Sequence, residues 1–276
     1  MRALAVVALL MQVSVAIVDA QNPPTAQGSK PIQDNSFLLE EAYNQEAAVI
    51  QHINTLFFDR TIHTWLYALT DEWPVISQRH QLSVTIPVQN SVAGQAAALG
   101  DIALNYRLQL VGNGDTRLAV TPRVTVLFPT AAAELGGGQL AFQGALASSF
   151  VARQRLVLHT NAGVTLTPHA MVNVGTREGL LDLFAGQSAV WLVHPRLNLM
   201  LEGVVTNVEE FTGVGTARTR ETAVTISPGL RWAYNFPSGL QIVPGLAFPF
   251  GFRANDGQRG VFLYLSFEHE MPGLKK

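Results

Sequence analysis

The chain has 276 residues, a formal net charge of −2 and no cysteine, and only 14% of its residues are charged. The lack of cysteine excludes disulfides, thiol catalysis and cysteine-ligated metal, and the near-neutral charge provides no basic footprint for nucleic acid. An ordinary soluble domain is roughly 25% charged, so the composition favours a membrane environment. Beyond residue 20, however, no stretch approaches the ~18 uninterrupted apolar residues of a membrane helix.

Residues 1–20 have the features of a secretory signal peptide. Arg2 provides the positively charged start, residues 3–18 form the apolar core, and Val18-Asp19-Ala20 matches the small-residue cleavage pattern. We therefore predict an exported protein. An N-terminal membrane anchor is the alternative, and the polar residues 22–25 that follow favour cleavage.

Residues 21–47 are predicted to be an N-terminal periplasmic segment. Its first part is rich in Pro, Gln, Gly and Ser, which is typical of a flexible linker. In the second part, Asp34 or Ser36 would suit the cap of a short helix with acidic residues in its first turns. We hypothesise that this part folds into the barrel mouth as a plug or gate; a periplasmic helix without a gating role is the alternative. The residues assigned to the plug are Asp34, Phe37, Glu40, Glu41, Tyr43 and Glu46.

Residues 48–270 show the alternation of a membrane β-barrel. The clearest case is the stretch 101–110, where apolar residues from Ile102 to Leu110 take every second position and polar residues lie between them. Side chains of a strand alternate between its two faces, so one face suits lipid and the other suits water. The pattern predicts about twelve strands, near 48–57, 64–70, 80–89, 100–111, 116–128, 139–151, 155–168, 181–193, 197–208, 221–235, 240–252 and 260–269.

The predicted connections are alternately short and long. Tight turns such as 194–196 and 236–239 separate longer stretches such as 169–180 and 209–220. Short turns of outer-membrane barrels lie in the periplasm and long loops lie outside, so both termini are predicted to be periplasmic.

Two features depart from this regular pattern. The stretch 71–79 is longer than the short turn expected there, and the strands at 48–57 and 181–193 alternate poorly, so the sequence does not determine their register.

The last predicted strand, residues 261–267, resembles the C-terminal signal read by the bacterial barrel-assembly machinery. It departs from the usual form because Phe267 is followed by Glu268-His269-Glu270 and a tail, residues 271–276. The resemblance implies that this machinery and outer-membrane lipid are partners of the chain.

Four blocks resemble a family of outer-membrane transporters. They are Asp34–Glu46, His80-Gln81-Leu82-Ser83, the run from Gly100 to Arg107, and the late segment from Pro244 to Pro249. Together they resemble the transporters grouped with the meta-pathway phenol-degradation proteins. The resemblance covers most of the mature chain and implies an exported barrel that passes small organic molecules. It transfers no functional residues.

The polar face of the predicted strands supplies candidate pore-lining residues. Charges in a channel lumen set the local field and the selectivity. The alternative is structural, because interior Arg–carboxylate pairs also fill a narrow barrel and satisfy one another. Most candidates are cationic, which hints at anionic solutes. They are Asp101, Asn105, Arg107, Gln109, Arg117, Arg123, Glu202, Arg231 and Arg253.

A catalytic or metal site on the barrel wall is an alternative to a channel. A lipase-type site needs Ser, His and an orienting residue close together, and Ser149, His159 and Asn161 are candidates on two neighbouring strands. No Gly-x-Ser-x-Gly motif accompanies them, so we interpret them as polar lumen residues. The seven histidines include no His-x-x-x-His pair. We predict no catalytic residues, no metal and no cofactor.

The sequence therefore predicts an all-β protein, an antiparallel transmembrane barrel of about twelve strands in the outer membrane of a Gram-negative bacterium. Its expected function is passive passage of small solutes, aromatic or anionic. A structural or lipid-modifying barrel without transport activity is the alternative, and a soluble lipid-binding β-protein is a third one. Nucleic acid is not an expected partner, and the sequence determines neither the solute nor the oligomeric state.

Overall fold

The structure is a computed structural model that describes residue 32 and residues 35–90, 92–132, 135, 138–173, 176–212 and 217–270. The predicted signal peptide, most of the predicted linker and the C-terminal tail at 271–276 lie outside the described residues. Within the described ranges, no helix is long and apolar enough to cross a membrane.

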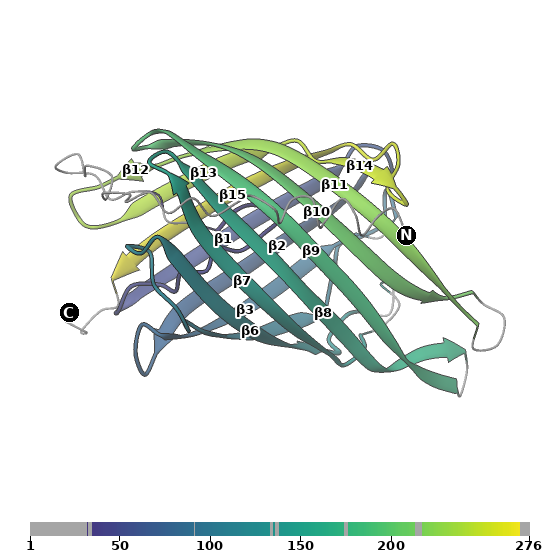
Figure 1. Cartoon of the computed structure of the whole chain (residues 1–276). Helices are drawn as coiled ribbons and strands as arrows, with labels where there is room; N and C mark the ends of the chain where they lie inside the picture. Colours follow the sequence, from purple (N-terminus) through teal and green to yellow (C-terminus); the bar gives the residue numbers. More distant parts are fainter. Residues whose placement is uncertain are drawn as a thin grey trace.

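The described residues form fifteen strand segments in a single antiparallel sheet (Figure 1). Their bounds are β1 (Val49–Asp59), β2 (Thr64–Val75), β3 (His80–Gln89), β4 (Ala98–Leu99), β5 (Ile102–Leu108), β6 (Leu118–Phe128), β7 (Ala141–Arg153), β8 (Leu156–Asn173), β9 (Thr176–His194), β10 (Leu197–Phe211), β11 (Arg218–Trp232), β12 (Tyr234–Asn235), β13 (Gln241–Ala247), β14 (Phe250–Arg253) and β15 (Gly260–Glu270).

The sheet closes on itself to make a barrel. β1 pairs with β15 along its whole length, from Val49 opposite Glu270 to Asp59 opposite Gly260. The segments make twelve spanning strands, because β4 continues into β5, β12 extends β11, and β13 and β14 are one strand interrupted near Pro249. The prediction of an all-β antiparallel barrel of about twelve strands is confirmed.

The two faces of the wall have opposite chemistry. On β5, Leu104 points outward and is 37% exposed, whereas the neighbouring Asn105 and Arg107 point inward and are buried. Large exposed apolar side chains surround the outer face, which suits contact with lipid rather than water. They include Leu104, Val124, Leu146, Val164, Leu183, Leu201, Ile226, Leu263 and Leu265.

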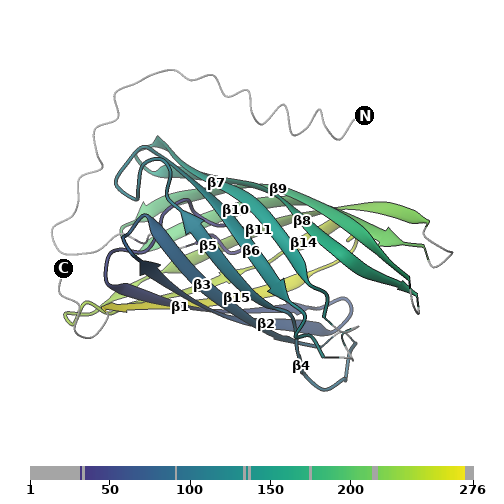
Figure 2. The same ribbon diagram turned by 90° about the horizontal axis from the view of Figure 1, so that it is seen from below.

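The barrel has two different ends, which we call the terminal end and the loop end. At the terminal end lie the start of β1, the end of β15 and close turns such as 154–155 and 195–196. At the loop end, the hairpins β8–β9 and β10–β11 reach furthest beyond the other strands (Figures 1 and 2).

The structure corrects three details of the predicted loops. β2 continues to Val75, so the turn to β3 is short and the overlong stretch disappears. The predicted loops 169–180 and 209–220 are largely strand. Their alternation fails because both faces of a strand that extends past the bilayer meet water, so Glu209, Arg218 and Arg220 form ion pairs there.

The two poorly alternating strands also have a physical explanation. β1 and β9 turn apolar residues inward, among them Ile53 and Val190, and both belong to a buried apolar cluster inside the barrel. This cluster includes Phe37, which precedes the first strand. The lumen is thus partly apolar because another segment of the chain packs in it.

Candidate functional site: a segment inside the barrel

Residues 35–47, which we call the inner segment, run through the barrel interior. They contain no helix, so the expectation of a short helix is wrong for these residues. Their backbone N–H and C=O groups bond to side chains of the wall instead of to each other, as a helix would require. Because these hydrogen bonds satisfy its N–H and C=O groups, the buried backbone can remain irregular.

The first stretch, residues 35–39, is held by charged side chains. The carboxylate of Glu202 on β10 accepts the N–H groups of Phe37 and Leu38 at 3.2 and 2.9 Å. Arg231 on β11 donates to the carbonyl of Asn35 at 2.6 Å. Both charged residues are almost completely buried, so these bonds form in a low-dielectric interior, where they are strong.

Phe37 also anchors this stretch by apolar packing. Its ring centre lies 5.6 Å from that of Phe262 and 5.3 Å from that of Tyr264, both on β15. Gly245 on β13 leaves the space, because a Cβ there would lie 2.5 Å from the Phe37 ring. Burying a side chain of this size stabilises the docked segment by about 2–3 kcal/mol.

The second stretch, residues 40–45, is held mostly by neutral side chains, with Arg107 and Arg123 as the charged exceptions. Asn161 on β8 accepts the Glu40 N–H at 2.9 Å and donates to the Glu40 carbonyl at 2.7 Å. Gln109 repeats this two-way contact, accepting from the N–H of Asn44 at 2.9 Å and donating to the carbonyl of Ala42 at 2.5 Å. Such paired contacts resemble a strand ladder built from side chains.

Further bonds complete this stretch. The N–H of Ala42 donates to Ser149 Oγ at 2.8 Å, and its carbonyl accepts from Thr121 at 3.0 Å. The N–H of Gln45 donates to Gln81 at 2.7 Å. All of these bonds are made to backbone N–H or C=O groups of the segment and not to its side chains.

Tyr43 lies against His159, with the two rings edge to face and their centres 6.1 Å apart. Burial, followed by the charge of Glu41, raises the pKa of the Tyr43 phenol from its ordinary 10.0 to about 12, with a hydrogen bond to Ser149 acting in the other direction. The phenol therefore keeps its proton at neutral pH.

Two arginines face each other on the wall where the inner segment passes. Arg107 on β5 and Arg123 on β6 are directly opposite in the strand register, and like charges in that position repel. The inner segment supplies their acceptors: Arg107 donates to the carbonyls of Glu41 and Tyr43, and Arg123 forms an ion pair with Glu40.

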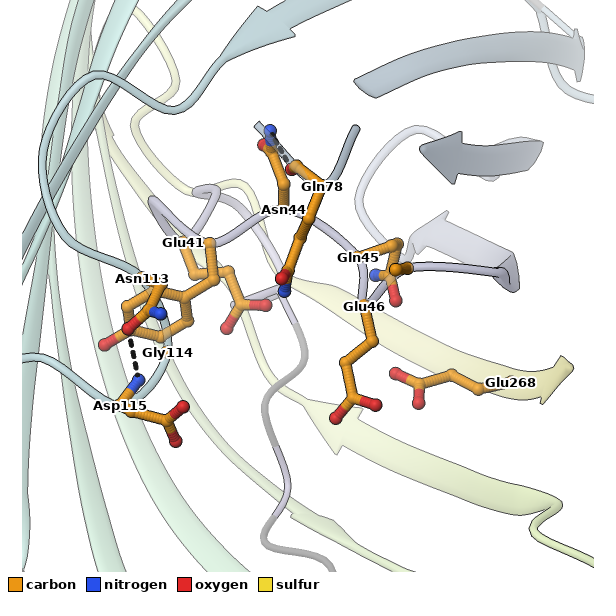
Figure 3. Close-up of a pocket in the computed structure, with 11 residues that line it drawn as sticks. Glu41, Asn44, Gln45, Glu46, Gln78, Asn113, Gly114, Asp115 and Glu268 are labelled. Carbon is orange, nitrogen blue, oxygen red and sulfur yellow. Dashed lines mark hydrogen bonds between the residues drawn. The ribbon is translucent and has the colours of Figure 1, made fainter. Parts of the chain in front are cut away.

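Among the described residues, cavities lie along the inner segment. A cavity of about 420 Å³ at the terminal end includes the side chains of Glu41, Glu46, Asp115 and Glu268, and Figure 3 shows those of Glu46 and Glu268 pointing toward one another. A cavity of about 380 Å³ lies on the loop-end side, and one of about 210 Å³ lies beside it; both contain Glu40 and Arg123.

Most of the candidate pore-lining residues lie in the lumen. Asn105, Arg107, Gln109, Arg123, Glu202 and Arg231 point inward, and all of these except Asn105 contact the inner segment.

Three others lie at the rims. Asp101 accepts the N–H of Ala131 at 2.9 Å in a loop-end connection, and Arg253 is exposed at the loop end. Arg117 precedes β6, and its guanidinium lies 5.1 Å from the ring centre of Phe150, which faces outward; its place in the pore lining stays a prediction. Alternation alone cannot distinguish a residue just before a strand from one within it.

The candidate plug residues are placed as follows. Phe37, Glu41 and Tyr43 are buried inside the barrel, Glu40 contacts Arg123, and Glu46 lines the terminal-end cavity. Asp34 lies outside the described residues.

Sequence reasoning did not single out several wall residues that hold the segment: Gln81, Thr121 and Ser188. Ser188 Oγ lies 2.8 Å from Ser36 Oγ. All three occupy inward positions of their strands, so the strand alternation marks them as lumen residues, but nothing in the sequence says what they contact.

The candidate catalytic trio lies inside the barrel. Ser149 Oγ is 2.7 Å from His159 Nδ1, and the two residues are 1% and 2% exposed. Asn161 uses its amide on Glu40 instead of orienting His159. The trio therefore faces the inner segment and not the lipid, where the acyl chains of a lipase substrate would be.

A cluster of titratable side chains lies on the outer face, where β15, β1 and β2 pair side by side. His52 Nδ1 lies 2.6 Å from Asp71 Oδ1, and His52 Nε2 lies 3.1 Å from His269 Nε2. Among the described residues, no three histidine or acidic side chains are arranged to hold a metal ion.

Ala48 joins the inner segment to β1 with a backbone φ of 60°. A left-handed conformation costs a residue with a Cβ about 1–2 kcal/mol. This single residue redirects the chain from the lumen into the wall.

Comparison with known proteins gives structural neighbours but no family. No family description matches the chain, and no curated protein does. The NanC porin superposes with a TM-score of 0.56 at 10% identity, covering 78% of this chain and 98% of the porin. The COG4313 outer membrane channel from Pseudomonas putida F1 gives 0.59 at 13% identity, covering 82% and 97%.

At such identities the likeness shows the fold alone. These neighbours are outer-membrane channel barrels rather than enzymes. The resemblance to the meta-pathway phenol-degradation group is not confirmed by them and stays a prediction.

Proposed function

We propose that the protein is an outer-membrane channel for small solutes whose pore is closed by its own inner segment and opens when that segment is displaced. The observation that carries the proposal is the position of residues 35–45, which are buried or half-buried in the lumen and bonded to strands from β3 to β11. The channel character of the structural neighbours supports it.

The chemistry of the contacts suits reversible closure. The inner segment does not pair with the wall as a strand; side chains hold it, and each neutral hydrogen bond contributes only about 1 kcal/mol net. Water entering an open lumen would replace these bonds. The same polar side chains would then line the pore, with the opposed Arg107 and Arg123 favouring anionic solutes.

In the membrane, the terminal end would face the periplasm, as the short turns of such barrels do. This orientation fits export by a cleaved signal peptide and insertion by the barrel-assembly machinery. The inner segment would then enter the lumen from the periplasmic side.

Deletion of residues 22–46 tests the proposal. In planar lipid bilayers, the full chain should be closed most of the time, whereas the deletion variant should conduct steadily. Deletion of residues 22–31 alone is the matched control, because it leaves the inner segment in place. Heat-modifiable migration in detergent gels would show that each barrel is folded. Equal conductance of the two deletion variants and the full chain would contradict the proposal.

The competing hypothesis is a structural or lipid-modifying barrel without transport. It predicts that liposomes containing either the full chain or the 22–46 deletion stay tight to sugars and aromatic acids. A channel predicts swelling with the deletion variant.

A further inference from the structure

The ion pair between Arg123 and Glu40 lies on the floor of the loop-end cavity. Glu40 belongs to the inner segment and Arg123 to the wall, so this pair ties one to the other. Apolar side chains stand beside it, among them Leu38, Phe184 and Val204. The cavity of about 380 Å³ lies at the small end of the ~300–1,000 Å³ typical of ligand sites.

Arg123 has donor capacity that the protein does not use. Besides Glu40, its guanidinium donates to Gln143, and its buried Nε has no hydrogen-bond partner among the described residues. A guanidinium binds a carboxylate best through two parallel N–H groups. A carboxylate that took both terminal nitrogens, Nη1 from Glu40 and Nη2 from Gln143, would therefore replace Glu40 with a contact through two parallel N–H groups.

The neighbouring charges add to this preference. Arg107 lies directly opposite Arg123 on the wall, so an anion that enters as the inner segment leaves would offset the repulsion between them. Asp182 also lines the cavity, although its carboxylate accepts the N–H of Glu209 at 2.9 Å. Its negative charge disfavours ligands with a second carboxylate.

We infer that a small monocarboxylate with an apolar body is the ligand that opens the channel, by replacing Glu40 on Arg123. The apolar body would pack on Phe184 and Val204 while the carboxylate takes the guanidinium. The ligand binds the undocked state better, because Arg123 is then free of Glu40, and this difference in affinity shifts the equilibrium toward opening. The inference rests on the proposed function and names the class of solute that acts on it.

The test uses the full chain in planar bilayers with 3-phenylpropanoate as the probe and 3-phenylpropan-1-ol as its neutral match, at constant ionic strength. The carboxylate should raise the open probability and the alcohol should not. Glu40→Gln should raise the open probability without ligand and lower the half-maximal concentration of 3-phenylpropanoate about tenfold, because the competing carboxylate is gone.

Arg123→Gln should also open the pore partly, but it should abolish the response to the carboxylate. Arg123→Lys keeps the positive charge but loses the two parallel N–H donors, so it should bind 3-phenylpropanoate about tenfold more weakly. Arg253→Gln, which changes an exposed arginine at the loop end, is the matched control and should respond as the unchanged protein does.

Titration calorimetry of the detergent-solubilised variants gives a readout besides conductance. Equal responses to acid and alcohol, or an unchanged response in Arg123→Gln, would overturn the inference. If the 22–46 deletion opens the pore but the carboxylate has no effect, the inference fails and the proposed function stands. If that deletion does not open the pore, the proposed function itself fails.

Discussion

The two stretches of the inner segment are held in different ways. Residues 35–39 depend on a particular side chain, Phe37, and on the charged wall residues Glu202 and Arg231. Residues 40–45 are held mainly through their backbone, by the amides and hydroxyls of the wall. The wall therefore contacts the side chains of Phe37 and Glu40, whereas most of its other bonds are to backbone groups of the segment. Apart from Glu40, substitutions within the segment should accordingly matter more in the first stretch than in the second.

The largest effect is expected from Phe37→Ala. Removing a buried aromatic ring from a packed site costs about 3 kcal/mol, which would raise the ratio of open to closed channels roughly hundredfold. Single-channel recording measures this ratio, and Phe37→Leu should restore most of the closure. An unchanged ratio in a folded Phe37→Ala barrel would show that the first stretch is not an anchor.

Glu202→Gln should have the next largest effect. The carboxylate accepts two N–H groups of the segment, and the amide keeps only a neutral acceptor. We expect a loss of about 2 kcal/mol in docking, seen as an increase in open probability. Glu210→Gln removes an exposed carboxylate of the same strand and should leave the recordings unchanged; similar effects of the two variants would argue against a specific anchor.

Gln109→Ala tests the second stretch from the wall side. It removes the bonds to Asn44 N–H and the Ala42 carbonyl, at a cost of about 1.5 kcal/mol. Asn44→Ala is the comparison on the segment, because the backbone N–H remains, and it should cost less than about 1 kcal/mol. A larger effect of Asn44→Ala than of Gln109→Ala would contradict backbone recognition.

The smallest effect at neutral pH comes from Tyr43, and it grows only in alkali. Because the pKa of the docked phenol is raised from 10.0 to about 12, docking favours the protonated form. Its contribution is complete below pH 10 and is lost as the pH rises from about 10 to about 12. The open probability should increase over that interval, and Tyr43→Phe should remove this component; an identical alkaline profile in both proteins would refute it.

Much of the wall could be predicted from the sequence. Lipid requires an apolar side chain at every second position, so the alternation from Ile102 to Leu110 reveals a strand without further information. The strand prediction is less reliable where a face of the wall contacts the inner segment or water instead of the usual lipid or polar lumen. β1 and β9 turn apolar residues toward the inner segment, and the ends of β8 to β11 extend beyond the apolar belt.

The site was less predictable than the wall. Inward positions such as Arg107, Gln109 and Glu202 follow from alternation, but the rule does not place Arg117, which precedes its strand and lies against the ring of Phe150. Local sequence also favoured a helix near Ser36, because capping and acidic first-turn residues are local signals. The wall overrides those signals by bonding the backbone groups that a helix would have used.

The sequence by itself determined the barrel, because the bilayer requires apolar and polar residues to alternate along each strand. It did not determine what fills the barrel. That was decided by the tertiary structure, which brings β3 to β15 around residues 35–47 and places Arg107 beside Arg123. Contacts between residues far apart in the chain leave no period in the sequence, so only the closed barrel shows which polar side chains hold the segment and which line a cavity.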